Sequence, residues 1–144
     1  MDLSFGVAGP GRVGMSLAKA FAAAGLSCAG VYGGTHAKAR AAELGVRHFN
    51  EPLGLVAAAD FFFFCVPDRF INEAAESMAK AAAQAGLDVC GRYFYHVSGS
   101  AGLDELAPLK ALGAETGSLH PLQSFAAPVK SLAGIGMAVD GSGK

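Results

Sequence analysis

A glycine-rich turn near the amino terminus, Gly9-Pro10-Gly11-Arg12-Val13-Gly14, limits the possible folds of this chain more than any other segment. An apolar run precedes it and apolar residues at helical spacing follow it, so we expect a strand that turns directly into a helix. Such a turn points backbone N–H groups and the positive end of the helix dipole at one place, where a pyrophosphate binds. Gly9 is expected to allow the tight turn, Gly11 the approach of the phosphates and Gly14 close packing of helix on strand. The alternative is a glycine turn of structural use alone.

Strand and helix patterns alternate along the rest of the chain. Strands are expected at residues 3–8, 27–32, 46–49, 61–66, 93–97, 115–119 and 135–139, and helices at 12–24, 37–44, 52–59, 69–85 and 108–113. This alternation requires a parallel sheet with helices on both faces, connected by right-handed crossovers. We therefore expect a doubly wound α/β fold, a Rossmann fold, that forms one dinucleotide-binding domain over residues 1–144.

Charge and hydropathy exclude several classes of partner. The formal net charge is −1 and no basic cluster occurs, so neither nucleic acid nor an anionic membrane surface is expected. The longest apolar run, residues 61–66, is far shorter than the about 20 residues of a membrane span and suits a strand buried on both faces. The first residues lack the pattern of a signal peptide.

The three cysteines, Cys28, Cys65 and Cys90, are spaced unlike a zinc site or a redox pair. We expect free thiols in a reducing compartment, hence a cytoplasmic protein without a metal site. Cys65 lies close to the expected ligand, so a reactive thiol is the alternative to a structural one there.

The segment after the second expected strand, residues 32–36, reads Tyr-Gly-Gly-Thr-His and contains no carboxylate. In NAD sites of this architecture an acidic residue about 20 positions past the glycines holds the ribose hydroxyls. We therefore expect NADP over NAD, with Thr35 bonding the 2′-phosphate and His36, Lys38 or Arg40 supplying positive charge. The alternative is a helix cap at Thr35 and a solvated basic face on the helix.

Ligands of doubly wound sheets bind beyond the carboxyl ends of the strands, so polar residues there are candidates for chemistry. The backbone of Val66 and Pro67 is expected to border a cofactor ribose. Asp68 is expected to cap the next helix rather than to act as an acid or base.

Two further loops carry the catalytic candidates. His96, Ser98 and Ser100 could hydrogen-bond a carboxamide or a substrate oxygen, the alternatives being a core histidine and serines that satisfy a turn. His120 is the strongest candidate, because it precedes a proline at a strand exit and its imidazole exchanges protons near neutral pH. A hydrogen-bonded structural histidine is the alternative, and Gln123 could orient a polar substrate group. No GxSxG elbow supports a serine triad.

Four segments together carry a family resemblance: Gly9–Gly14, Val66-Pro67-Asp68, His96-Val97-Ser98-Gly99 and Gly117–Phe125. Over essentially the whole chain the sequence resembles Rossmann-like proteins related to pyrroline-5-carboxylate reductase and the deazaflavin-dependent NADP oxidoreductases, within the 6-phosphogluconate dehydrogenase-like superfamily. The resemblance implies an NADP-dependent oxidoreductase. Members typically continue into a helical carboxyl-terminal domain that closes the active site and usually builds the dimer. This sequence has none, so it is expected to be the amino-terminal domain of a longer protein or a short natural version.

The leading hypothesis is hydride transfer between NADP and a small polar metabolite, with the pyrophosphate on residues 11–13 and His120 with Ser98 polarising or deprotonating the substrate. A nucleotide-binding or sensor module without turnover, or half of a larger assembly such as a homodimer, is the alternative. The His-Pro step is also similar to prephenate dehydrogenases, in which the histidine contacts the substrate hydroxyl, and this leaves a third reading open.

Overall fold

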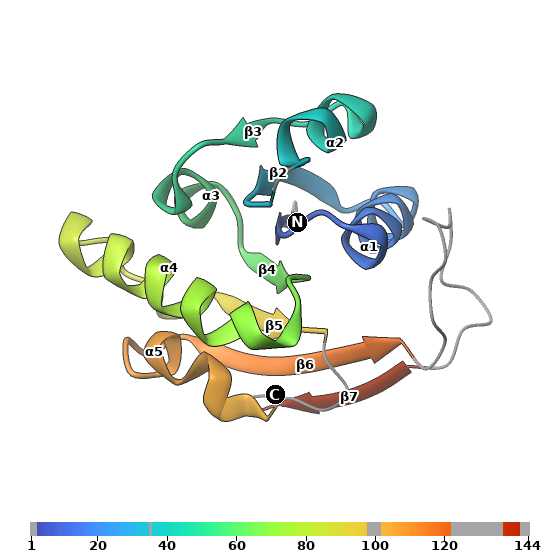
Figure 1. Ribbon diagram of the computed structural model, residues 1–144. Helices are drawn as coiled ribbons and strands as arrows, with labels where there is room; N and C mark the ends of the chain where they lie inside the picture. Colours follow the sequence, from blue (N-terminus) through green and yellow to red (C-terminus); the bar gives the residue numbers. More distant parts are fainter. Residues whose placement is uncertain (1–2, 35, 98–101, 122–136, 142–144) are drawn as a thin grey trace.

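The computed structural model describes residues 3–34, 36–97, 102–121 and 137–141, and within them the chain builds one sheet in the order β3-β2-β1-β4-β5-β6-β7 (Figure 1). The strands are β1 (Ser4–Ala8), β2 (Ser27–Tyr32), β3 (His48–Phe49), β4 (Phe61–Phe64), β5 (Tyr93–His96), β6 (Glu115–Pro121) and β7 (Met137–Gly141). Strands β1 to β6 run parallel, as expected. The last strand differs, because β7 is antiparallel to β6 and forms an edge, a common addition to an otherwise parallel sheet.

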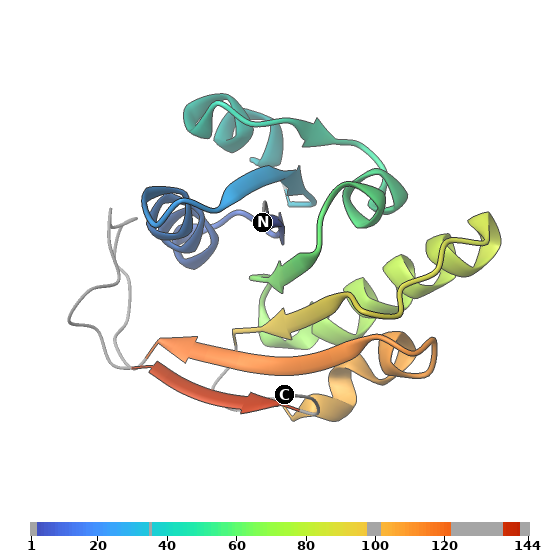
Figure 2. The same ribbon diagram turned by 180° about the vertical axis from the view of Figure 1, so that it is seen from behind.

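Helices cover both faces of the sheet (Figures 1 and 2). The helices are α1 (Arg12–Ala23), α2 (Ala37–Leu44), α3 (Pro52–Ala58), α4 (Ile71–Ala85) and α5 (Ala107–Lys110), with the 3-10 turns η1 (Asp68–Phe70) and η2 (Leu103–Leu106). Helices α1 and α2 lie on one face, and α3, α4 and α5 lie on the other, which confirms the doubly wound arrangement. In the part of the chain described, no helix is long and apolar enough to cross a membrane.

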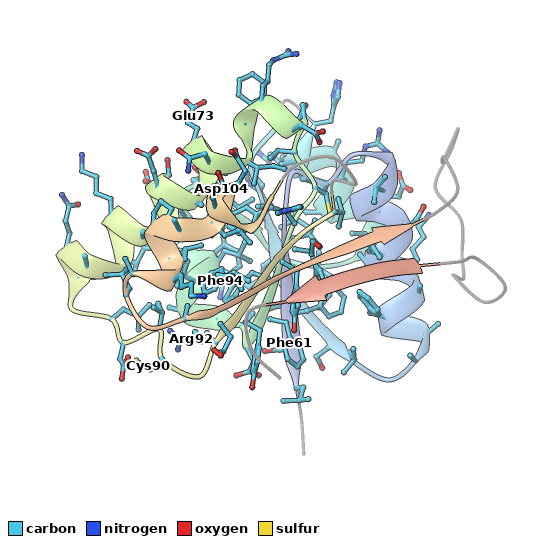
Figure 3. All side chains as sticks on the ribbon, turned by 90° about the horizontal axis from the view of Figure 1, so that it is seen from below. Phe61, Glu73, Cys90, Arg92, Phe94 and Asp104 are labelled. Atoms are coloured by element: carbon cyan, nitrogen blue, oxygen red, sulfur yellow. The ribbon has the colours of Figure 1, made fainter. Side chains whose placement is uncertain are left out.

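The four phenylalanines of β4 explain why this central strand reads as an unbroken apolar run. Phe62 and Phe64 belong to the core beneath α3 and α4, whereas Phe63 belongs to the core beneath α1. Phe62 stacks on Phe94 of β5 at a centroid distance of 4.6 Å, and Phe63 stacks on Phe21 of α1 at 5.1 Å. Figure 3 shows Phe94 on the side of the sheet that α4 and α5 cover. A strand buried on both faces holds the centre of the sheet rigid, and its carboxyl end enters the site described below.

Several expected bounds differ from the structure, and the start of the helix after β4 is the difference that bears on the site. Asp68 does not cap the helix that follows β4, because the chain first makes the 3-10 turn η1, which follows Pro67. Helix α4 begins only after that turn, with Phe70 at its N-cap position. A sequence pattern that marks a helix start does not distinguish an α-helix from a preceding 3-10 turn.

Candidate functional site

The turn that links β1 to α1 is built around the backbone of Gly9. Its φ of +84° is a left-handed conformation that glycine adopts without strain, and its N–H donates to the Tyr32 carbonyl oxygen of β2 at 2.9 Å. The Gly11 N–H then donates to the Gly9 carbonyl oxygen at 2.8 Å. The Gly11 carbonyl accepts the first helical bond from the Met15 N–H, also at 2.8 Å. The turn therefore starts α1 at the carboxyl edge of the sheet.

The other two glycines of the motif differ sharply in their surroundings. A Cβ atom on Gly14 would lie 2.9 Å from the Gly9 carbonyl oxygen and 3.0 Å from Cγ1 of Val7, so α1 packs directly against the strand. A Cβ atom on Gly11 would meet nothing within 4 Å, and Gly11 is exposed. The expected packing at Gly14 is thus present, and open space lies beside Gly11. Helix α1 begins here without a side-chain cap, so the first N–H groups of the helix have neither an intrahelical acceptor nor a capping side chain.

A pocket of about 190 Å³ opens beside this turn. It is lined by Gly9, Pro10 and Gly11 of the turn, Gly33 and Gly34 after β2, His36, Ala37 and Arg40 at the start of α2, and Cys65, Val66 and Pro67 after β4. Three loops that are distant in sequence therefore meet at the carboxyl ends of neighbouring strands. Seven residues expected at a cofactor site are among them: Gly9, Pro10, Gly11, His36, Arg40, Val66 and Pro67.

The structure separates the basic residues that the sequence left equivalent. Arg40 and His36 line the pocket, one helical turn apart on the same face of α2. Lys38 is exposed and is not among the lining residues, because it projects from a different side of the helix. None of the described residues that line the pocket is acidic, and Arg40 is positively charged, so the lining favours an anion.

Two glycines take the place of the acidic residue that NAD sites carry after the second strand. Gly33 and Gly34 have φ values of +83° and +92°, and a Cβ atom on Gly34 would meet nothing within 4 Å. The loop therefore leaves room beside α2. These two glycines and Ala37 line the pocket although they were not predicted as cofactor residues. The glycine pair after the strand was a usable signal, and so was the position of Ala37 three residues before Arg40.

Cys65 also lines the pocket, at the end of β4. Burial raises the pKa of its thiol to about 12, so the thiol is protonated at neutral pH. A protonated thiol is a poor nucleophile, and this environment is that of a structural cysteine. All three cysteines are free.

His96 ends β5 away from this pocket. Its imidazole is fully buried, and Nε2 lies 3.1 Å from the Gly102 carbonyl oxygen. His96 is not among the lining residues, so its environment is that of a hydrogen-bonded core histidine.

The remaining candidates are placed only in part. His120 lies near the carboxyl end of β6, where its backbone pairs with Ala138 of β7, and this end of β6 faces the same edge of the sheet as the pocket. Arg12 and Val13 form the first turn of α1. Thr35, Ser98, Ser100 and Gln123 lie outside the described residues.

Comparison with known proteins identifies the fold. The model of the Rossmann-like domain family matches residues 1–121. No curated protein matches the sequence significantly. The match to the family model agrees with the resemblance to Rossmann-like proteins that the sequence motifs indicated.

Several solved structures are similar. A proposed NADP oxidoreductase from Bacteroides fragilis has a TM-score of 0.80 and 18% identity, covering 99% of this chain and 53% of that chain. The 3-hydroxyisobutyrate dehydrogenase of Mycobacterium tuberculosis has a TM-score of 0.69 and 18% identity, covering 86% and 42%. An imine reductase variant from Myxococcus stipitatus, in complex with NAD⁺, has a TM-score of 0.67 and 18% identity, covering 86% and 42%. The chain thus spans about half the length of these structures.

Proposed function

The chain belongs to the Rossmann-like domain family, and we propose that it binds a nicotinamide dinucleotide as the cofactor domain of an oxidoreductase. The observation that carries the proposal is the convergence of the glycine turn, the glycine pair and Arg40 on one pocket at the carboxyl edge. Ligands of doubly wound sheets bind in that position. Solved structures with a similar fold include oxidoreductases, although their sequence identity of 18% to this chain establishes only the fold.

The residues of the turn fit the pyrophosphate. The phosphates approach the open side of Gly11 and accept hydrogen bonds from the N–H groups of Arg12 and Val13, in the first turn of α1. Gly9 and Gly14 hold this turn against the sheet, while Val66 and Pro67 border the ribose from the β4 side.

We propose NADP rather than NAD. A 2′-phosphate placed between the glycine pair and α2 would lie beside Arg40 and His36, and the described lining contains no carboxylate to repel it. Thr35, which lies in the sequence between the glycine pair and α2, is proposed to donate a hydrogen bond to the same phosphate.

The proposed reaction is hydride transfer to or from a small polar metabolite. The nicotinamide supplies or accepts the hydride when bound, and this chain's residues bind and orient the reactants. His120 is proposed to hold or move the proton of the substrate oxygen, with Ser98 as a hydrogen-bonding partner. A helical domain or a second copy of the chain is proposed to complete the substrate side, since the matched structures are about twice as long. Three free thiols suit a cytoplasmic location.

A nucleotide-binding module without turnover is the second candidate. It is favoured by the burial of His96, which removes one of the three catalytic candidates from direct contact with a ligand. Turnover by the wild type, lost in His120→Ala, would decide for the enzyme.

Titration of the chain with NADPH and NADH, followed by the nicotinamide fluorescence, tests the proposed cofactor. We expect saturable binding of both, with NADPH tighter. Absence of binding to either at millimolar concentration would overturn the cofactor assignment.

A further inference from the structure

His36 and Arg40 are the two basic residues among the described residues that line the pocket beside the glycine turn. They stand four positions apart at the start of α2. The His36 carbonyl oxygen accepts the first hydrogen bond of this helix, from the Arg40 N–H at 2.9 Å. Side chains at this spacing lie on one face of a helix. One turn of backbone therefore holds the imidazole and the guanidinium beside the same space.

The imidazole of His36 is open to solvent and does not cap the helix. His36 is exposed, and it occupies the N-cap position of α2 without a side-chain hydrogen bond to the helix. An imidazole in contact with water exchanges its proton near neutral pH, whereas a guanidinium keeps its charge. The positive charge beside the pocket can therefore change with pH at His36 while it stays constant at Arg40.

The other titratable groups near α2 do not provide such a change at the pocket. Cys65 lines it, but burial raises the pKa of its thiol to about 12. Helix α2 packs against α1, β2 and β3. Within the described residues, the other charged or titratable side chains of these elements are not part of the lining: Lys38 of α2, Lys19 of α1 with its ion-pair partner Glu43, Cys28 and Tyr32 of β2, and Arg47 and His48 at β3.

We propose that His36 makes the cofactor preference of this site depend on pH, because its protonated imidazole acts beside Arg40 as a second cation that holds the 2′-phosphate of NADP. The inference rests on the proposed dinucleotide site. Below neutral pH two cations face the phosphate and favour NADP over NAD. Above neutral pH the imidazole is uncharged, Arg40 acts alone, and the preference for NADP decreases. NAD lacks the 2′-phosphate, so its affinity changes little.

Calorimetric titration of the chain with NADP⁺ and with NAD⁺, at about pH 6.5 and about pH 8.5, tests the proposal. We expect the ratio of the two affinities to be about threefold larger at the lower pH, the effect of one exposed ion pair. This rise should be absent in His36→Gln, which gains no charge. In His36→Lys, which is charged at both pH values, the ratio should be high at both. A phosphate monoester itself takes up a proton near about pH 6, and the comparison with His36→Gln removes that contribution.

His48→Gln is the matched control, because this half-buried histidine of β3 does not line the pocket. It should retain the rise of the wild type. A rise that persists in His36→Gln, a rise that disappears in His48→Gln, or a wild type that binds both nucleotides with a ratio independent of pH would overturn the role of His36. Failure of the wild type to bind either nucleotide would instead overturn the proposed dinucleotide site.

Discussion

The Cβ atom of a residue at position 14 would lie 2.9 Å from the carbonyl oxygen of Gly9, which leaves no room for a side chain between α1 and the turn. Because the obstructing atom belongs to the backbone, it cannot move aside by a change of rotamer. We predict that Gly14→Ala lowers the free energy of unfolding by about 1–3 kcal/mol, the usual cost of overpacking. Urea denaturation followed by circular dichroism measures it. Unchanged stability would show that α1 shifts freely on the sheet.

The same substitution at Gly11 is expected to leave the stability of the fold nearly unchanged and to weaken cofactor binding. Its Cβ atom meets nothing within 4 Å, so Gly11→Ala is expected to change stability by less than about 1 kcal/mol. The added methyl would, however, occupy the space proposed for the phosphates. We expect NADPH affinity to fall by about tenfold or more in calorimetric titration, since charge-assisted hydrogen bonds are displaced. An unaltered affinity would move the phosphates away from Gly11.

Arg40 is predicted to distinguish NADPH from NADH. Arg40→Ala removes the guanidinium that lines the pocket and should weaken NADPH on the order of tenfold while changing NADH little. Lys38→Ala is the control, because this exposed side chain on the same helix does not line the pocket. Equal losses for the two substitutions would indicate general attraction of anions rather than a 2′-phosphate contact.

The buried thiol of Cys65 is expected to make the free energy of unfolding depend on pH in the alkaline range. Burial raises the pKa of its thiol from an ordinary value of 9.0 to about 12 in the folded chain. The unfolded chain therefore releases this proton first, so the stabilisation is present below pH 9 and is lost as the pH rises toward 12. Between about pH 8 and about pH 10 the wild type should lose about 1 kcal/mol more than Cys65→Ala.

Urea midpoints at the two pH values measure this difference. Cys90→Ala is the control, because Cys90 is exposed, in the segment between α4 and β5 (Figure 3). It should retain most of the wild-type decrease. Identical pH dependence in wild type and Cys65→Ala would mean that the thiol is not desolvated.

The elements near the glycine turn were predictable because their signals are local. The strand at Ser27–Tyr32 and the helix at Ala37–Leu44 have the bounds expected from apolar periodicity and from the glycine that ends the helix. The antiparallel direction of β7 was not predictable, since an apolar strand pattern is the same in either direction. It depends on pairing with β6, which is a tertiary contact.

The loops that line the site were predictable from the sequence, whereas the side chains that reach it were less so. The glycine motif, Val66 and Pro67 line the pocket because loops after parallel strands meet at one edge. The choice of Arg40 over Lys38 follows from the phase of α2 relative to the sheet, which its short and weakly patterned sequence does not reveal. A core position for His96 was one of the two readings that the sequence offered, and the structure decides for it, since the imidazole is buried and hydrogen-bonded to the Gly102 carbonyl at the start of η2.

The pocket beside the glycine turn is proposed to hold the cofactor. A titration of isotope-labelled chain with NADPH, followed by amide chemical shifts, tests this claim residue by residue. We predict the largest shifts at Gly9, Gly11, Gly34, Arg40 and Val66, with small shifts at a second groove, between the later turns of α1 and α2, that Ala22 and Leu44 line. Shifts concentrated at that groove, or no shifts at the glycine turn, would contradict it.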